Sequence, residues 1–258
     1  MKSIYFICLF LTVLIISACS DSTGNGDSTD KHSLQYFVSS LKELKQDTAF
    51  AWAIGGQKNY LEDSTYPYSV IFHQILGSWN FQYFETKSTN DNPEDLKLYF
   101  KKEYDVWIMF DGNLRRFRHP GVQNDVWGRV AFRTNSSIYL SKAIRIKGKD
   151  KPTLFMDSVV QIDMNNPMEP YFSWLDDRGT PNSIYFEALA TDLNYLVSAT
   201  ITRERYFKFY DLANVIYNLR DVLPPPTLSY GFVHNFILIG IDKDNWGYFI
   251  SERTFLVE

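Results

Sequence analysis

The stretch FVHNFILIGI, residues 232–241, decides the fold of this chain. In a strand, successive side chains point to opposite faces. One face of this stretch carries Phe236 and Leu238, and the other carries Ile237, Ile239 and Ile241. Strands that are apolar on both faces are typical of sheets covered from two sides. We therefore expect a central strand here, buried from both directions.

The sequence around this stretch predicts further strands at the spacing of a β-sandwich. Short apolar and β-branched runs alternate with turn residues, and Asp192-Leu193-Asn194 predicts the turn of a hairpin. The expected strands are Leu154–Ile162, Pro170–Trp174, Ser183–Ala190, Leu196–Thr202, Val215–Leu219, Phe232–Ile241 and Tyr248–Phe255.

Two local patterns in this region resemble the fibronectin type III family. Trp174, in the segment PYFSW, has the position of the tryptophan that fills the family's core from the second strand. Leu228, Gly231 and His234 match the spacing of the family's Leu-x-Pro-Gly-x-x-Tyr corner, with Tyr230 in place of Pro and His234 in place of Tyr. The resemblance covers roughly the last 100 residues. It implies a sandwich in which His234 closes the corner by bonding to the backbone.

The region before this sandwich also predicts strands, after one short helix. Ser33 precedes apolar residues near helical spacing, namely Leu34, Phe37, Val38, Leu41 and Leu44. The expected strands are Tyr68–Gln74, Trp79–Glu85, Tyr104–Phe110, Val126–Arg133 and Ile138–Ile146. Asp111-Gly112 predicts a tight turn, and Asp95–Lys102 a helical turn.

The fold class that follows is mainly β. Aromatic residues make up 17% of the chain, and Tyr and Phe favour strands. We expect a β-rich domain at 33–149 with a short leading helix, and then a fibronectin type III/immunoglobulin-like β-sandwich at 150–258. The segment GKDKP, residues 148–152, is the expected boundary, with a simple loop inside one larger sandwich as the alternative.

The first 20 residues predict a location. Lys2 leads into an apolar run from Ile4 to Ile16, shorter than the roughly 20 residues of a spanning helix. Cys19 follows Ser17 and Ala18, and this segment resembles the lipobox of bacterial lipoproteins. The resemblance implies a signal peptide at 1–18 and acylation of Cys19. An ordinary cleaved signal or a short anchor helix is the alternative.

This resemblance also implies a membrane partner. Residues 19–32 are almost entirely small or polar and predict a flexible tether. Several acyl chains on Cys19 would hold the protein at a membrane. Ser20, rather than Asp, follows the acylated position, and by analogy with enterobacterial sorting this favours the cell envelope's outer membrane.

Charge and cysteine content exclude other classes. The chain carries −4, and loss of Lys2 with the signal leaves −4 − 1 = −5, so we expect no nucleic-acid partner. Cys8 leaves with the signal and Cys19 carries lipid. The mature fold then has no disulfide and no thiol nucleophile.

Catalytic motifs are missing from the sequence. No HExxH spacing and no Gly-x-Ser-x-Gly elbow occurs, so we predict no catalytic residue, no metal site and no cofactor. His119 ends the basic run Arg115–His119. We interpret that run as a solvated turn, with an anion or acidic glycan site as the alternative.

Two acidic loops of the sandwich are the candidate contact sites. Asp242 and Asp244 resemble the start of a calcium loop, but Trp246 stands where an oxygen ligand is needed. Asp176 and Asp177 lie on a loop expected at the same end. All five residues are possible ligand or partner contacts. Trp246 in a polar turn favours an exposed anchor, and the alternative is that it folds back to cap the sandwich.

These observations favour a non-catalytic binding or assembly module held at a membrane surface by lipid, with an envelope protein as partner. The alternative is a surface lipoprotein that binds or degrades polysaccharide through residues 49–148. Four tryptophans support that alternative: Trp52, Trp79, Trp107 and Trp127. A third possibility is a subunit of a larger envelope complex that docks through exposed strand edges.

Overall fold

The structure is a computed structural model and describes residues 30–39, 43–55, 67–191, 195–209, 211–219 and 227–258. These residues contain one α-helix, α1 (Leu34–Ser39), which Ser33 caps by accepting a hydrogen bond from the Tyr36 backbone N–H. The strands of the first half are β1 (Leu44–Ala49), β2 (Ala51–Gly55), β3 (Tyr68–His73), β4 (Trp79–Glu85), β5 (Phe100–Lys102), β6 (Val106–Met109), β7 (Leu114–His119), β8 (Val126–Arg133), β9 (Ile138–Ser141) and β10 (Ile144–Ile146).

The second half contains only strands and turns among its described residues. They are β11 (Leu154–Phe155), β12 (Val160–Asp163), β13 (Tyr171–Trp174), β14 (Ile184–Thr191), β15 (Leu196–Thr202), β16 (Tyr206–Lys208), β17 (Val215–Asn218), β18 (Val233–Ile241) and β19 (Gly247–Leu256). Short 3₁₀ turns at Leu96–Leu98 and Phe110–Gly112 lie at the two turns that the sequence predicts. The mainly β fold class is confirmed.

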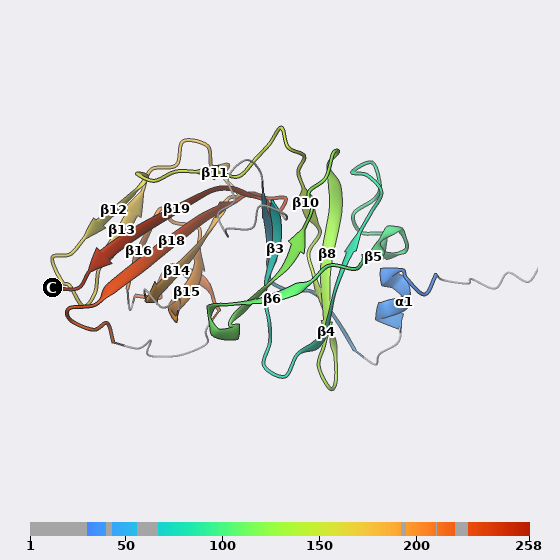
Figure 1. Ribbon diagram of the computed structural model, residues 1–258, viewed down its shortest axis with the longest axis horizontal. Coiled ribbons are helices and arrows are strands. Elements are labelled where there is room, and N and C mark those ends of the chain that lie inside the picture. The colour runs from blue at the N-terminus through green and yellow to red at the C-terminus, as the bar shows by residue number, and fades with distance from the viewer. Residues whose placement is uncertain (1–29, 40–42, 56–66, 192–194, 210, 220–226) are drawn as a thin grey trace, which may run out of the picture.

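The strands form four sheets. Sheet I has the order β1-β9-β8-β4-β5, with β10 also paired to β8, and sheet II has the order β2-β3-β7-β6. Sheet III has the order β11-β19-β18-β14-β15-β17, and sheet IV is β12-β13-β16. We call sheets I and II the N-sandwich and sheets III and IV the C-sandwich. Figure 1 shows the two sandwiches side by side along the longest axis, with α1 at one end and the C-terminus at the other.

Four apolar clusters lie between and beside these sheets. The first lies between sheets I and II, with Phe72 and Phe132 stacked at a centroid distance of 6.1 Å, and the second lies between sheets II and III. The third lies between sheets III and IV, and the fourth packs α1 on the outer face of sheet I. Sheets II and III are thus covered on both faces.

Strand β18 shows this double coverage residue by residue. Phe236 and Leu238 belong to the core of the C-sandwich, whereas Ile237, Ile239 and Ile241 face sheet II. On that second side they meet Trp52, whose side chain is fully buried and packs on Phe186 at a centroid distance of 4.8 Å. The alternation in the sequence therefore predicted correctly that β18 is buried from both sides.

The C-sandwich has the strand order expected of a fibronectin type III/immunoglobulin-like fold. Three strands form one sheet, and a larger sheet has β18 between β14 and β19. Trp174 on β13 is buried in the core beside Tyr185. His234 is buried too, and its Nδ1 lies 3.1 Å from the Phe232 carbonyl oxygen. Gly231 provides the positive φ of 74° that the corner requires.

Some sequence predictions of local structure are wrong. Arg115–His119, interpreted as a solvated turn, lies in β7, and His119 is fully buried. Leu44, assigned to the helical pattern, begins β1. The expected long strands 154–162 and 138–146 are each broken into two. The hairpin turn 192–194, and Cys19 with its signal and tether through residue 29, lie outside the described residues.

Among the described residues, no helix has the length and apolar character needed to cross a membrane. Segment 148–152 joins β10 to β11, between the two sandwiches. The division into two domains there stays a prediction.

Candidate functional site at the junction of the sandwiches

The turn between β18 and β19 joins the C-sandwich to the N-sandwich. It begins at Asp242, whose Oδ1 accepts hydrogen bonds from the backbone N–H groups of Asp244 (2.9 Å) and Trp246 (3.1 Å). Asn245 takes a positive φ of 58°, a region that Asn tolerates better than most residues. The backbone carbonyl of Asn245 then accepts from the Ala53 N–H on β2 at 3.0 Å. The turn therefore adds backbone pairing to sheet II.

Trp246 is not exposed. Its side chain is 1% accessible and belongs to the core of the N-sandwich, and its ring centroid lies 5.9 Å from that of Tyr68. The expected surface anchor is thus an internal anchor. The alternative expectation was that Trp246 folds back and caps the C-sandwich. The side chain is indeed buried, but in the core of the neighbouring N-sandwich.

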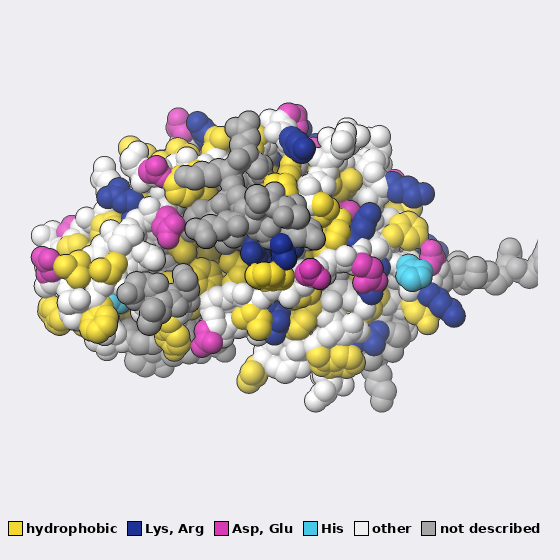
Figure 2. All heavy atoms as spheres, in the orientation of Figure 1, with side chains coloured by type: hydrophobic (Ala, Val, Ile, Leu, Met, Phe, Trp, Pro, Cys, Tyr) yellow, Lys and Arg dark blue, Asp and Glu magenta, His cyan; other side chains and the backbone are white. Residues whose placement is uncertain are grey.

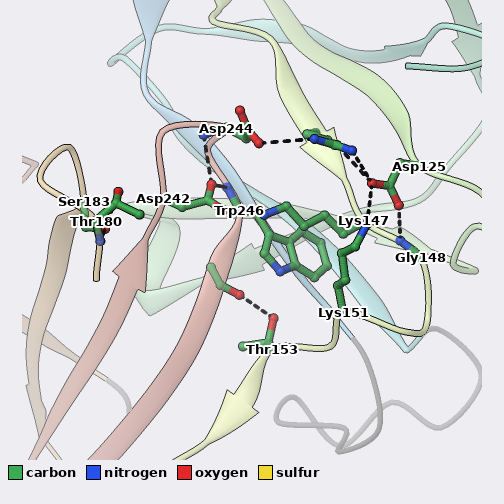
Figure 3. A network of polar contacts seen from close by, with 12 residues as sticks. Asp125, Lys147, Gly148, Lys151, Thr153, Thr180, Ser183, Asp242, Asp244 and Trp246 are labelled. Carbon is green, nitrogen blue, oxygen red and sulfur yellow. Dashed lines mark hydrogen bonds and ion pairs between the residues drawn. The ribbon is translucent and has the colours of Figure 1, made fainter. Parts of the chain in front are cut away.

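Charged residues surround this anchor. Lys147 forms an ion pair with Asp242, and the Arg145 backbone N–H donates to the Asp244 carbonyl at 2.9 Å. Asp125 accepts from Gly148 N at 2.8 Å, and it also pairs with Arg145 and Lys151 (Figure 3). Burial would raise the pKa of Asp125, but these partners outweigh burial and lower it.

Thr153 adds a polar bridge on the other side of the turn. Its hydroxyl accepts from the Gly55 N–H at 2.9 Å and donates to the Gly247 carbonyl at 2.6 Å. One side chain thus links β2 of sheet II to β19 of sheet III. Figure 3 marks the second of these bonds, from the Thr153 hydroxyl to a backbone carbonyl. Asp242 and Asp244, predicted as ligand contacts, are built into the same junction.

The other acidic loop is also structural at its first residue. Asp176 is buried, and its Oδ2 accepts from the hydroxyls of Tyr185 (2.8 Å) and Tyr248. Its Oδ1 accepts from the backbone N–H groups of Arg178 and Gly179. Burial would raise the pKa of Asp176, but these four donors lower it. Asp177 keeps an 88% exposed side chain, so it remains available as a contact.

The two acidic loops are linked through Tyr248, the second residue of β19, which bonds to Asp176. Their carboxylates do not converge on one point. No group of three or more His, Cys, Asp and Glu side chains that could hold a metal occurs among the residues that the structure describes.

The N-sandwich contains a buried acid and base that the sequence did not single out as a pair. Nε2 of His119 lies 2.6 Å from Oε1 of Glu85, and both side chains are at most 5% accessible. The Gly121 N–H donates to Nδ1 of His119 at 2.9 Å. Nδ1 is therefore an acceptor, and the ring proton lies on Nε2 and is donated to Glu85. The pair joins β4 to β7.

A cleft of about 500 Å³ opens beside the junction. One wall is apolar and includes Phe50, Ile216 and Tyr217. The rim carries Lys142, Arg203 and Lys243, and the cleft also has Asp47, Thr48, Ala49, Ala51, Asn182, Ile184, Ile201, Asp242 and Asn245 along its lining. These residues come from both sandwiches, so the cleft exists only because the sandwiches are packed together.

The aromatic wall is fixed by contacts between the sandwiches. The ring of Tyr217 on β17 lies 6.0 Å from that of Phe50, which follows β1. Its hydroxyl lies 3.1 Å from Nδ1 of His73 on β3. The wall is therefore held in place before any ligand arrives.

Comparison with known proteins adds no family. No protein-family model and no curated protein matches the chain. Among solved structures, a two-domain fibronectin type III segment of chicken tenascin is similar at 12% identity with a TM-score of 0.27, over 73% of this chain and 91% of that one. The chicken interferon gamma receptor alpha chain is similar at 10% identity with a TM-score of 0.24, over 80% of this chain and 96% of that one.

A third solved structure, described as a cytokine receptor complex, is similar at 9% identity with a TM-score of 0.23, over 73% of this chain and 91% of that one. These values are too low to carry an argument about function. The fold assignment rests on the strand order and on the positions of Trp174 and His234.

Proposed function

We propose that this protein is a non-catalytic binding or assembly module, held at the surface of a bacterial envelope membrane by lipid on Cys19. The observation that carries the binding role is the cleft at the junction. Clefts of roughly 300–1,000 Å³ with an apolar wall and a few converging polar groups are the usual form of a ligand site. This one is built from both sandwiches.

The packing of the body supports the proposal. An apolar layer continues from sheet II to sheet III, and it includes Trp52, Phe186 and Ile239. Interfaces that resemble a protein core hold their parts in a fixed relation, whereas small polar interfaces allow relative motion. The body therefore presents its cleft and its outer surfaces in one fixed arrangement.

The anchoring role is supported by the sequence at 1–20 and by the position of α1. Helix α1, the first described element after the expected tether, lies at the end of the body opposite the C-terminus (Figure 1). A lipid on Cys19 would place the C-sandwich at the distal end. In this arrangement the junction and the C-sandwich are held away from the anchored end.

The anchor is tested by cell fractionation and by mass spectrometry of the mature N-terminus. Cys19→Ala is expected to abolish acylation and to move the chain out of the detergent-rich phase, or to leave it as unprocessed precursor. Cys8→Ala is the matched control, since it removes a thiol from the same leader without touching the expected acylated residue. Equal partitioning of the two variants would refute the anchor.

The binding role is tested by cross-linking in native membranes, followed by purification and mass spectrometry. A recurrent protein partner, absent from a parallel purification of an unrelated lipoprotein, is the expected result. Recovery of polysaccharide without protein would support the alternative function. Recovery of neither would contradict a binding role.

The polysaccharide alternative keeps part of its support. Trp52 is fully buried, but Trp79 and Trp107 are 50% and 47% accessible. The guanidinium of Arg133 lies over Trp79, at 6.0 Å from the ring centroid, and that of Arg118 lies over Trp107 at 4.5 Å. On the face that Figure 2 shows, hydrophobic side chains reach the surface at several separate places. A sugar chain would stack on a row of uncovered aromatic rings. These two rings are instead partly covered by arginine side chains.

A further inference from the structure

We infer that the junction cleft binds a small amphiphilic organic anion, with a carboxylate, phosphate or sulfonate head on an apolar body. This inference rests on the proposed binding function and names the ligand class of the same site. It follows from how the charges of the cleft are partnered and from where its apolar surface lies.

The acidic residues of the cleft are already engaged. Asp47 forms an ion pair with Nη1 of Arg129 at 3.1 Å, and Arg129 is fully buried. Asp242 pairs with Lys147 and accepts two backbone hydrogen bonds from its own turn. Neither Arg129 nor Lys147 is part of the lining, so each carboxylate is paired from behind the cleft wall, and Arg129 is shared with Glu94 at 2.8 Å.

The cationic residues of the cleft are not engaged. Lys142, Arg203 and Lys243 are exposed, and none of their side chains forms an ion pair with any residue that the structure describes. They come from three separate places: the break between β9 and β10, the end of β15 and the turn between β18 and β19. The fold gathers three free positive charges at one rim, although the chain as a whole carries −4.

A concentration of one charge sign in a cleft attracts ligands of the opposite sign. Arg also binds carboxylate and phosphate groups through two parallel hydrogen bonds. A cation-lined rim therefore selects an anionic head group. It disfavours neutral sugars, which need no charge partner.

The apolar wall selects the rest of the ligand. Ile216 and Tyr217 on edge strand β17 are 52% and 37% accessible, and Phe50 lies beside them. Covering exposed apolar surface is favourable by roughly 25 cal/mol per Å². A ligand with only a charged head would leave this wall in water, whereas an amphiphilic anion would cover it.

The probe for this inference is 8-anilinonaphthalene-1-sulfonate, an anion whose fluorescence rises in apolar surroundings. It is titrated into the full chain carrying Cys19→Ala, so that no attached lipid competes for the dye. We expect saturable binding at one dye per chain. We expect the double variant Arg203→Glu/Lys243→Glu to raise the Kd roughly tenfold, as the loss of two partly exposed charge contacts implies.

The matched control is Lys87→Glu. Lys87 is exposed in the loop after β4 and does not line the cleft. It should leave the Kd unchanged. The double variant and the control change only exposed side chains, so both proteins are expected to fold. Near-ultraviolet circular dichroism checks that they do.

Competition then distinguishes the sources of the anion. Decanoate and decyl phosphate are each expected to displace the dye, whereas decyltrimethylammonium, which has the same chain and the opposite charge, is not. Stronger displacement by decanoate would indicate a fatty-acid-like carboxylate, and stronger displacement by decyl phosphate a lipid phosphate. Absence of saturable dye binding, an equal loss in Lys87→Glu, or displacement by the cation would each overturn the inference. These outcomes would leave the membrane anchor and any cross-linked protein partner unaffected.

Discussion

The indole of Trp246 lies in the core of the sandwich opposite to the one that supplies it, with its ring centroid 5.9 Å from that of Tyr68. Tyr68 belongs to β3 of sheet II, whereas Trp246 follows β18 of sheet III. The adjacent hydrogen bond from Ala53 to Asn245 fixes the approach of the two segments. This arrangement makes the stability of the N-sandwich depend on the C-sandwich.

Trp246→Ala is therefore expected to lower the free energy of unfolding by roughly 3–5 kcal/mol, the usual cost of removing a buried tryptophan. Urea denaturation followed by circular dichroism measures this loss. The affected core is that of the N-sandwich, so hydrogen exchange should accelerate in β3 and β8 as well as in β18 and β19. A loss confined to the C-sandwich would contradict the internal anchor.

Trp107→Ala serves as the control for this change. Trp107 is 47% accessible on edge strand β6, and the guanidinium groups of Arg116 and Arg118 lie over its ring. Its removal should cost far less than the removal of Trp246, because surface substitutions usually change stability by about 0.5 kcal/mol or less.

The position of Trp246 could not be predicted from the sequence around it. The segment DKDNWG is polar, and local reasoning assigns an indole in such a turn to the surface. The residues that bury it, Ala53 and Tyr68, lie 193 and 178 positions earlier in the chain. The pattern of β18 was more informative, because Ile237, Ile239 and Ile241 alternate with Phe236 and Leu238 inside one strand.

The basic run 115–119 shows a second limit of sequence reasoning. Three arginines in five residues favour a solvated turn, yet these residues form β7 in the middle of sheet II. The guanidinium of Arg115 lies 4.6 Å from the ring centroid of Phe81, and that of Arg118 lies 4.5 Å from Trp107. Arginine stems and planes can cover aromatic surface while the strand stays paired. The cleft was likewise beyond local reasoning, because its lining comes from separate segments of both sandwiches.

Asp242→Ala should weaken the junction, because both carboxylate oxygens have partners there. Oδ1 accepts from two backbone N–H groups and Oδ2 pairs with Lys147. We expect a loss of roughly 1–3 kcal/mol, the range for leaving buried or partly buried hydrogen-bond partners unsatisfied. Asp242→Asn keeps an oxygen for the backbone groups and removes only the charge, so it should lose less. Thermal denaturation of the two variants side by side measures the difference.

Glu187 should make the protein less stable as pH rises. It lies on β14 inside the C-sandwich, and its Oε2 accepts from Thr200 at 2.7 Å while Oε1 has no partner among the described residues. Burial raises the pKa of Glu187 well above its usual value of 4.5, and the Thr200 hydrogen bond offsets this only in part. Above pH 4.5 the unfolded chain releases a proton that the folded chain retains. Stability then falls by about 1.4 kcal/mol per pH unit until the folded group titrates.

Glu187→Gln removes this titration and keeps the shape of the side chain. Its stability relative to wild type should increase with pH over the range just above 4.5, as urea denaturation at a series of pH values would measure. A constant difference between the two proteins across this range would show that the carboxyl is not held in its neutral form.

Glu85 should have the opposite dependence on pH, although it is also a buried glutamate. Burial would raise its pKa, but the hydrogen bond from His119 and the charge of Lys102 outweigh burial and lower it below its usual value of 4.5. A carboxyl whose pKa is lower in the folded state contributes stability above the unfolded pKa, and this contribution is lost as pH falls through the folded pKa.

Glu85→Gln should therefore cost roughly 1–3 kcal/mol at neutral pH, and the difference from wild type should shrink in acid below pH 4.5. Urea denaturation between pH 3 and pH 7, with Glu187→Gln in parallel, would separate the two buried glutamates by the sign of their pH dependence. If Glu85→Gln instead gained on wild type as pH rose, then Glu85 would not be the ionised partner of His119 in the folded protein.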